Sequence, residues 1–585
     1  MKLFVQTLFF IFIIVSTPFA QVENMWQTKF EKSNYLETAR YAESIEYFQK
    51  LADASNFAKM FTFGNSPQNR EMWCIVISKD KAFTPEDAKR TGKPIMLIEN
   101  GIHSGEIEGK DASMILLREI LITKEKEKLL DDVILLVVPI FSVDAHERSR
   151  AYNRINQNGP TEMGWRTTAQ NLNLNRDWVK ADAPEMQAML KLFSTWLPDF
   201  FIDTHTTDGA DYQYNITYAL EKYTNIYKET GDWVKNKFTP YFVNRVEDQG
   251  FLIAPYVSFR DWDKGFESGI VDWAASPRLS EGYAAIQNRP GLLIETHMLK
   301  PYKDRVFSTR AALIASIEYV ANNAAELVKL NTAADKNSVK DFTIDNKFMP
   351  LNFKASEKAD TMLFKGFKYK KEMSEISGTE KLIYTDEKLD MKVPYYNDVQ
   401  PADSVKAPKA YLIPAEWSSI IDRITLHGIR VDTLKEAQEF NVTKTKFKNV
   451  TFAKSSYEGR HTARFETETF NDKIIAPVGT FYIPTNQRTV RVILTMLEPK
   501  SDDSFVKWGF FNVIFEQKEY FESYVMEKVA AEMLADNSAL KKEFEKKLAD
   551  DEKFKSNPNA RLNFFYERSP YFDEKLNLYP VMRIE

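Results

Sequence analysis

Residues 133–141 read VILLVVPIF and indicate the class of fold. A short, unbroken apolar run that is rich in β-branched residues is typical of a strand buried on both faces of a sheet. Shorter apolar runs at 94–98, 200–202 and 292–294 predict further strands, and apolar residues at helical spacing predict a helix over 112–122. Strands that alternate with helices indicate an α/β fold, with a mixed, largely parallel sheet flanked by helices.

The composition is that of an ordinary globular protein. The 585 residues are 44% hydrophobic and 28% charged, with a net charge of −5. These values exclude a wholly disordered chain and a strongly basic nucleic-acid wrapper, so no nucleic-acid partner is expected. Cys74 is the one cysteine, so any metal must be held by histidines and carboxylates.

The N-terminus has the pattern of a secretory signal. Lys2 is followed by a mostly apolar run and then by small residues up to Ala20, after which we expect cleavage. A permanent membrane anchor is the alternative, but the run is shorter than the roughly 20 apolar residues that a spanning helix needs. We therefore expect a secreted or periplasmic protein without stable membrane insertion.

The rest of the chain is predicted to form two regions. The polar stretch at 331–340 has the composition of a linker, which separates a first domain over 21–335 from a region over 336–585. Alternating residues at 442–447 and 489–494 predict strands, and 519–548 predicts a helix. The apolar face of that helix is predicted to consist of Tyr524, Val525, Val529, Met533 and Leu534. The second region is thus expected to be mainly β, with a helical segment and no assigned role.

Two histidines and a glutamate form a candidate metal site. His103 and Glu106 are three residues apart, directly after the strand at 94–98. His205 ends the apolar run at 200–202, which places it at the same edge of the predicted sheet. Two histidines and one glutamate with an open fourth position are a catalytic zinc pattern. The alternative for His205 alone is a hydrogen-bonded residue at the rim of the core.

Two further groups suggest catalysis and binding of a carboxylate. Asn175 and Arg176 offer an amide and a guanidinium side by side, which suits a carboxylate; a surface pair of Arg176 with Asp177 is the alternative. Glu295 directly follows the apolar run at 292–294. Burying a carboxylate without a positive neighbour costs free energy, so we expect Glu295 to face a functional site. The alternative is a salt bridge to a nearby cation, for which Arg289 and Lys300 are the candidates.

Taken in order, these motifs resemble those of the M14 metallocarboxypeptidases, the family of pancreatic-type zinc carboxypeptidases, over about residues 35–325. The resemblance implies a zinc carboxypeptidase-like fold and one zinc ion held by His103, Glu106 and His205. It also implies that Glu295 is the general base, which takes a proton from a zinc-activated water and returns it to the leaving amine. Residues 497–511 resemble the extra C-terminal region of large bacterial members.

The remaining site residues are implied by position in the family's pattern. Asn175 and Arg176 would hold the terminal carboxylate of the substrate, and Tyr283 is the nearest candidate for the tyrosine that covers it. Arg166, nine residues before Asn175, is selected as the arginine that stabilises the oxyanion. The arginines between the first ligands and the Asn-Arg pair are Arg148, Arg150, Arg154 and Arg166.

Two departures from the family's pattern bear on the substrate. Gly105 stands where pancreatic members carry an arginine, so contacts to residues further along a peptide are expected to be lost. Asn173 stands where many members have an aspartate, and its neutral amide would orient His103 without adding charge.

The resulting hypothesis is a secreted zinc metallocarboxypeptidase that hydrolyses C-terminal peptide bonds of substrates with a free carboxylate. A cell-wall peptide amidase or an N-acyl amino acid deacylase is the second hypothesis, because related zinc sites hydrolyse other amides. A non-catalytic peptide-binding protein on a peptidase scaffold is the third. The oligomeric state and the preferred C-terminal side chain are not predicted by these motifs.

Overall fold

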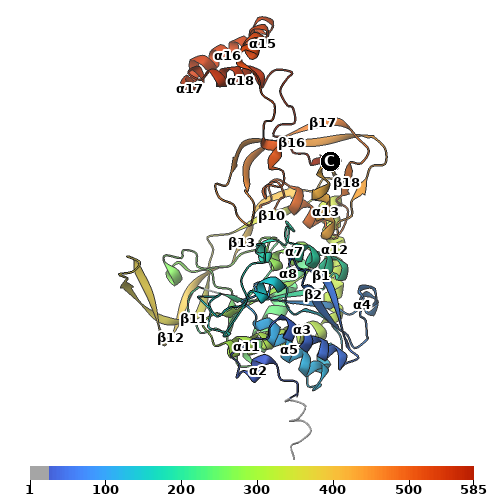
Figure 1. Cartoon of the computed structure of the whole chain (residues 1–585), viewed down its shortest axis with the longest axis vertical. Helices are drawn as coiled ribbons and strands as arrows, with labels where there is room; N and C mark the ends of the chain where they lie inside the picture. Colours follow the sequence, from blue (N-terminus) through green and yellow to red (C-terminus); the bar gives the residue numbers. More distant parts are fainter. Residues whose placement is uncertain (1–24, 208) are drawn as a thin grey trace, which may run out of the picture. The chain divides into compact units, whose positions relative to one another are not determined.

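The computed structural model describes residues 25–207 and 209–585 (Figure 1). The predicted secretory signal at 1–20 lies outside the described residues. The chain divides into two compact units: the first is built from residues up to 407 with 422–429 and 486–496, and the second from 408–421, 430–485 and 497–585.

The first unit is built on a sheet of eight strands. In sheet order these are β1 (Ala58–Asn65), β2 (Glu71–Ile77), β4 (Ile134–Val138), β3 (Ile95–Asn100), β5 (Phe200–Thr207), β9 (Gly291–His297), β6 (Ile216–Leu220) and β7 (Ile253–Pro255). The four central strands β4, β3, β5 and β9 run parallel, while β2 and β6 pair with them antiparallel. These central strands are the four apolar runs of the sequence, and the predicted α/β fold with a mixed, largely parallel sheet is confirmed.

Both faces of the central strands are covered, which explains their unbroken apolar sequence. On one face of β5, Phe200 and Ile202 belong to a large core that includes residues of α3 (Tyr41–Asp53), α5 (Glu108–Leu121) and α11 (Tyr302–Asn322). On the other face, the ring of Phe201 packs against Trp178, at 5.5 Å between ring centroids, and against Phe193 of α7 (Pro184–Trp196), at 5.9 Å. Alternation along the strand therefore sends successive side chains into two different cores.

Gly109 brings helix α5 close to the carboxyl ends of β3 and β5. A Cβ atom at this position would overlap the side chains of Thr204 and Asn100, so the close approach requires glycine. The turn at 101–107, which carries His103 and Glu106, is thereby held at this edge of the sheet.

Two local predictions for the first unit are wrong. Residues 331–340, predicted as a linker, lie in α12 (Ala324–Val339) and its continuation, so the predicted boundary at 335 falls inside a helix. Its polar residues are partly buried, and Asn331 donates a hydrogen bond to the carbonyl of Asp199 at 2.9 Å. The segment 489–494, predicted as a strand, lies almost entirely in helix α14 (Val490–Leu497). Nearly all side chains of α14 are buried, so the spacing of its apolar residues does not distinguish a helix from a strand.

Beyond α12, a β-ribbon extends the first unit. It consists of β11 (Asp360–Met373) and β12 (Glu380–Tyr396), and the end of β12 pairs in parallel with β8 (Ile270–Val271). A separate two-stranded sheet is formed by β10 (Phe348–Ala355) and β13 (Val399–Lys406).

The second unit contains a six-stranded sheet and a group of helices. In sheet order the strands are β15 (Asp432–Thr433), β18 (Phe481–Pro484), β14 (Ala410–Ile413), β19 (Met582–Ile584), β16 (Gln438–Phe452) and β17 (Ala463–Ala476). The predicted strand at 442–447 lies in β16, and the expectation of a mainly β region with a helical segment is confirmed.

The predicted helix at 519–548 is two helices, α15 (Ser523–Asp536) and α16 (Ser538–Asp550). Asn537 separates them and caps α16, since its side-chain oxygen accepts from the backbone N–H groups of Ala539 and Leu540. Val529, Met533 and Leu534 pack into an apolar cluster as predicted, whereas Tyr524 and Val525 are exposed. Among the described residues, no helix combines the length and hydropathy that a membrane span requires.

A buried histidine makes the stability of the first unit dependent on pH. His427 is fully buried, and its Nδ1 lies 3.0 Å from the hydroxyl of Tyr283. Burial lowers the pKa of His427 to about 3. The unfolded chain, with a histidine pKa of about 6.5, binds a proton that the folded site excludes, so acidification below 6.5 favours unfolding.

We expect this group to remove about 1.4 kcal/mol of unfolding free energy per pH unit as the pH falls from about 6 towards 4. His427→Gln should flatten that slope in urea denaturation followed by circular dichroism. His461→Gln, at an exposed histidine, is the matched control and should leave the slope unchanged. A slope that His427→Gln does not alter would contradict the assignment.

Candidate active site

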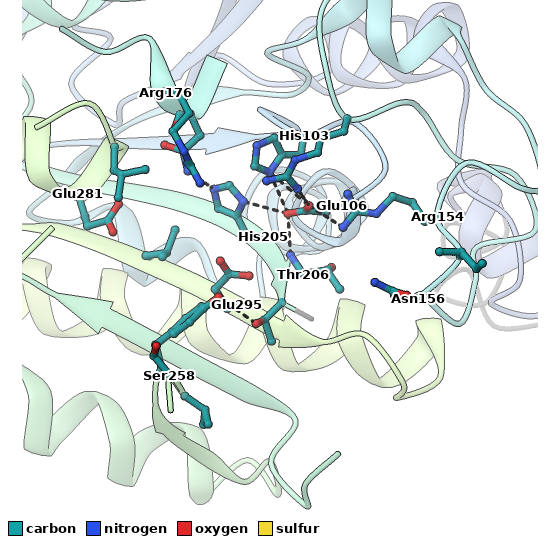
Figure 2. Close-up of a pocket in the computed structure, with 18 of the residues that line it drawn as sticks. His103, Glu106, Arg154, Asn156, Arg176, His205, Thr206, Ser258, Glu281 and Glu295 are labelled. Atoms are coloured by element: carbon teal, nitrogen blue, oxygen red, sulfur yellow. Dashed lines mark hydrogen bonds and ion pairs between the residues drawn. The ribbon is translucent and has the colours of Figure 1, made fainter. Parts of the chain in front are cut away.

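The predicted metal ligands meet at the carboxyl edge of the sheet (Figure 2). His103 and Glu106 lie in the turn between β3 and α5, and His205 lies on β5. Glu295, on β9, is paired in register with His205 on the neighbouring strand. Strand order and register thus bring together four residues that are separated by up to 192 positions (295 − 103) in the sequence.

His103, Glu106 and His205 form a buried three-donor cluster. One ligand atom from each lies within 4.8 Å of those of the other two. Nδ1 of His205 is 2.9 Å from Oε2 of Glu106, and Nδ1 of His103 is 3.2 Å from Oε1 of the same carboxylate. Two imidazole nitrogens and a carboxylate are a donor set that suits zinc.

The Nε2 atom of each imidazole contacts the side chain of a neighbouring polar residue. Nε2 of His103 lies 2.9 Å from Oδ1 of Asn173, and Nε2 of His205 lies 2.7 Å from Oδ2 of Asp203. Such partners orient metal-binding histidines, and here they leave both Nδ1 atoms directed at Glu106. The contact of Asn173 with His103 has the geometry that the sequence predicted. Asp203 was missed, although its position two residues before His205 on one strand places both side chains on one face.

The charge states of the cluster fit a cation site. Burial raises the pKa of Glu106, but His103 and Arg154 outweigh it and hold the pKa well below its usual value. Burial lowers the pKa of His103 to about 4, so this imidazole is neutral near pH 7. For His205 burial lowers the pKa, but Asp203 outweighs it and the pKa lies above its usual value. A metal ion competes with that proton.

Glu295 faces the cleft beside this cluster. Among the described residues, its buried Oε2 has no hydrogen-bond partner. Burial raises the pKa of Glu295; His205 opposes this shift, and the Glu106 carboxylate adds to it. The alternative salt bridges are not formed, because Arg289 pairs with Asp335 at 2.8 Å and Lys300 donates to the carbonyl of Tyr212 at 2.7 Å.

Asn175 and Arg176 line the same cleft, and Figure 2 shows Arg176 to one side of the three-donor cluster. They belong to a 3₁₀ turn over Leu174–Arg176, and Oδ1 of Asn175 accepts from the backbone N–H of Ser280 at 3.0 Å. The alternative pair of Arg176 with Asp177 is replaced by an ion pair of Asp177 with Lys180, at 2.5 Å. The guanidinium of Arg176 donates from Nη1 to the carbonyl of Asn175, at 2.5 Å, and lines the cleft.

Two of the four candidate oxyanion arginines reach the centre. Nη1 of Arg166 lies 3.1 Å and Nη2 of Arg154 lies 2.7 Å from Oε1 of Glu106. Arg148 instead lies over the ring of Trp165, and Arg150 pairs with the backbone of Met163. The geometry therefore places Arg154 in the site together with the predicted Arg166.

Gly105 explains the position of Arg154. A Cβ atom at Gly105 would lie 2.8 Å from the side-chain carbons of Arg154, so the stem of Arg154 occupies the space beside this glycine. Any larger residue at position 105 would therefore displace the side chain of Arg154.

The prediction for Tyr283 is wrong. Its side chain is fully buried on α10 (Ser280–Ile286), where it stacks on Trp178 at 5.2 Å and its hydroxyl meets His427. The helix turns this residue into the core behind the sheet, so it cannot cover a substrate. Tyr256 is the tyrosine that lines the cleft, with its ring 5.1 Å from that of Trp273.

The cleft has a volume of about 670 Å³. Besides the residues above, its walls include Trp165, Trp262, Trp273, Leu279 and Glu281. A buried three-donor cluster beside an unpartnered carboxylate and several guanidinium groups is the site of a metal-dependent hydrolase.

Comparison with known proteins gives the family. Residues 44–250 match the model of the M14 peptidases, described as zinc carboxypeptidase. The chain is 22% identical to Carboxypeptidase 2 of Trichophyton equinum over 492 residues, which cover 80% of this chain and 83% of that protein. Carboxypeptidase 2 of Trichophyton tonsurans is 23% identical with the same coverage. These matches support an M14 family member and indicate a metallopeptidase.

Two solved structures align with about half of the chain. A metallo-carboxypeptidase from Burkholderia cenocepacia aligns with a TM-score of 0.36 and 17% identity, over 48% of this chain and 70% of that one. Carboxypeptidase A from Helicoverpa armigera aligns with a TM-score of 0.35 and 14% identity, over 48% of this chain and 74% of that one.

Proposed function

We propose that this protein is an exported, zinc-dependent carboxypeptidase that hydrolyses the last peptide bond of substrates with a free C-terminal carboxylate. The observation that carries the proposal is the presence, in one cleft, of the three-donor cluster, the carboxylate of Glu295 and the guanidinium of Arg176. One peptide bound in this cleft could therefore contact both the three-donor cluster and the guanidinium of Arg176.

His103, Glu106 and His205 would hold the zinc ion. When bound, zinc supplies a Lewis acid that polarises the scissile carbonyl, and a positive charge that favours the ionised form of Glu295. Asn173 and Asp203 keep the two imidazoles in the orientation that binding requires.

The residues around the cluster divide the other tasks. Arg176 binds the terminal carboxylate, and Asn175 supports it from a position fixed by Ser280. Glu295 takes the proton of the attacking water at a carboxylate oxygen and delivers it to the leaving nitrogen. Arg166 and Arg154 stabilise the negative charge that develops on the carbonyl oxygen.

Product analysis separates this proposal from its alternatives. Purified protein is incubated with peptides, with cell-wall peptides and with N-acyl amino acids, and the products are identified by mass spectrometry. We expect free amino acids to be released from the C-termini of ordinary peptides. Cleavage confined to the other two classes would replace the proposal by an amidase or a deacylase.

Glu281 supports a preference for basic C-terminal residues. Its buried carboxylate lines the cleft, and no cation partner is found for it among the described residues. Ser280, the residue before it, donates to Asn175, so Glu281 is close to the group that binds the terminal carboxylate. Burial raises the pKa of Glu281, as it does that of Glu221, so a cationic side chain beside Glu281 would favour its ionised form.

We expect peptides ending in lysine or arginine to be hydrolysed with a higher kcat/KM than peptides ending in leucine. Glu281→Gln should lower kcat/KM for basic substrates by about 10- to 100-fold, since a charge-assisted contact is lost. Hydrolysis of the leucine peptide is the internal control and should change little. An equal loss for both substrates would indicate a structural role of Glu281.

Export is proposed from the pattern of residues 1–20 alone. Expression of the full chain in a bacterial host should yield a protein outside the cytoplasm whose first residue is Gln21. A cytoplasmic product that keeps Met1 would contradict this part of the proposal.

A further inference from the structure

Two exposed apolar side chains, those of Ile155 and Trp262, line the cleft. In Figure 2, Arg176 and Glu281 lie on one side of the three-donor cluster, and Arg154 and Asn156 lie on the other. Ile155, between these last two in the chain, lines the cleft with 98% of its surface exposed. Trp262 also lines the cleft and is 61% exposed.

Trp262 is held in place by a chain of aromatic contacts. Its ring packs edge-on against Phe259 at 5.0 Å, and Phe259 contacts Phe266 at 4.7 Å. Phe266 in turn packs at 4.7 Å against Phe364, a buried residue of ribbon strand β11. The exposed indole of Trp262 therefore packs on an apolar cluster to which the β-ribbon contributes. These contacts restrict the Trp262 side chain, so little of its conformational entropy is lost when a ligand binds.

The loop that carries Ile155 is also anchored. Arg305 is fully buried and ion-paired with Glu108 at 2.6 Å. Its guanidinium donates to the carbonyls of Asn158 and Gly159, at 2.8 and 2.6 Å. Because the loop is anchored, little conformational entropy remains to be lost when a ligand in the cleft contacts Ile155.

We propose that Ile155 and Trp262 form an apolar subsite for the side chains that precede the scissile bond, so that peptides of at least three residues with a bulky apolar residue at the third position from the end are preferred over shorter ones. The inference rests on the proposed function, since it takes Arg176 to bind the terminal carboxylate. The cleft volume of about 670 Å³ lies within the range of sites that enclose ligands larger than one amino acid.

The test uses three N-acetylated substrates that end in lysine: a dipeptide, and two pentapeptides with leucine or serine at the third position from the end. We expect the leucine pentapeptide to be preferred over the serine pentapeptide about ten-fold in kcat/KM, mainly through KM. Trp262→Ala and Ile155→Ser should reduce this preference to about two-fold and leave the dipeptide unaffected. Tyr152→Ala is the matched control, because Tyr152 is 88% exposed on the same loop and does not line the cleft.

A preference that survives both substitutions, or an equal loss with all three substrates, would overturn the inference. Calorimetric binding of the pentapeptides to Glu295→Gln, with and without Trp262→Ala, tests the subsite independently of turnover. If the wild type hydrolyses none of the substrates, the proposed function fails. Weaker binding of the leucine peptide after Trp262→Ala would then still support the apolar subsite, and unchanged binding would overturn it.

Discussion

Glu295→Gln is expected to lower kcat by at least about a thousand-fold while zinc remains bound. Removal of a positioned general base typically lowers the rate by about 10²- to 10⁴-fold. Glu295 lines the cleft beside His205, with which it is paired in strand register, and its Oε2 has no hydrogen-bond partner among the described residues. Glutamine keeps the shape of the side chain but cannot accept the proton. Peptide affinity should change little, because Arg176 is untouched.

The measurement combines initial rates with zinc content by atomic absorption and peptide affinity by calorimetry. Glu387→Gln, on the exposed surface of β12, is the control for the substitution itself and should keep full activity. Activity of Glu295→Gln within ten-fold of the wild type would show that another group moves the proton.

Loss of either histidine ligand should abolish both zinc binding and hydrolysis. His103→Ala and His205→Ala each remove one of three donors from a buried cluster, and the remaining pair is a much poorer site. The Glu106 carboxylate would then lack one of the imidazoles that hold its pKa low. We expect less than about a tenth of the wild-type zinc content after dialysis, and no measurable turnover.

His461→Ala provides the matched control, because His461 is exposed and lies in the second unit. A zinc content near one ion per chain in His205→Ala would contradict the assigned ligands. Circular dichroism of each variant distinguishes loss of metal from loss of fold.

The strands that position the site could be predicted from the sequence because they are buried on both faces. The runs at 133–141, 94–98, 200–202 and 292–294 are apolar at nearly every position, and each became a central strand. Polar residues that follow such runs must lie at the carboxyl edge of the sheet. His103, Glu106, His205 and Glu295 all follow such runs, so the sequence predicts that they lie close together.

Elements whose burial depends on tertiary contacts could not be predicted in this way. Residues 331–340 look like a linker, but buried side chains of α12 hold them in a helix. The stretch at 489–494 has β-branched residues at alternating positions and yet forms α14, because burial on nearly all sides overrides local preference.

The side-chain environment also decided which polar residues joined the site. Tyr283 has a suitable position in the sequence, but helix α10 turns it into the core. Arg154 belongs to the site because Gly105 leaves room for its side-chain carbons. This contact joins two loops, so a short sequence motif does not predict it.

The most direct test of the account compares two peptides that differ only at the C-terminus, one a free acid and the other an amide, with zinc-loaded wild-type protein. We predict that the terminal residue is released from the acid, while the amide is hydrolysed at least about a hundred-fold more slowly, because Arg176 has no carboxylate to bind. Equal hydrolysis of the two peptides, or no hydrolysis of either with one zinc ion bound per chain, would contradict it.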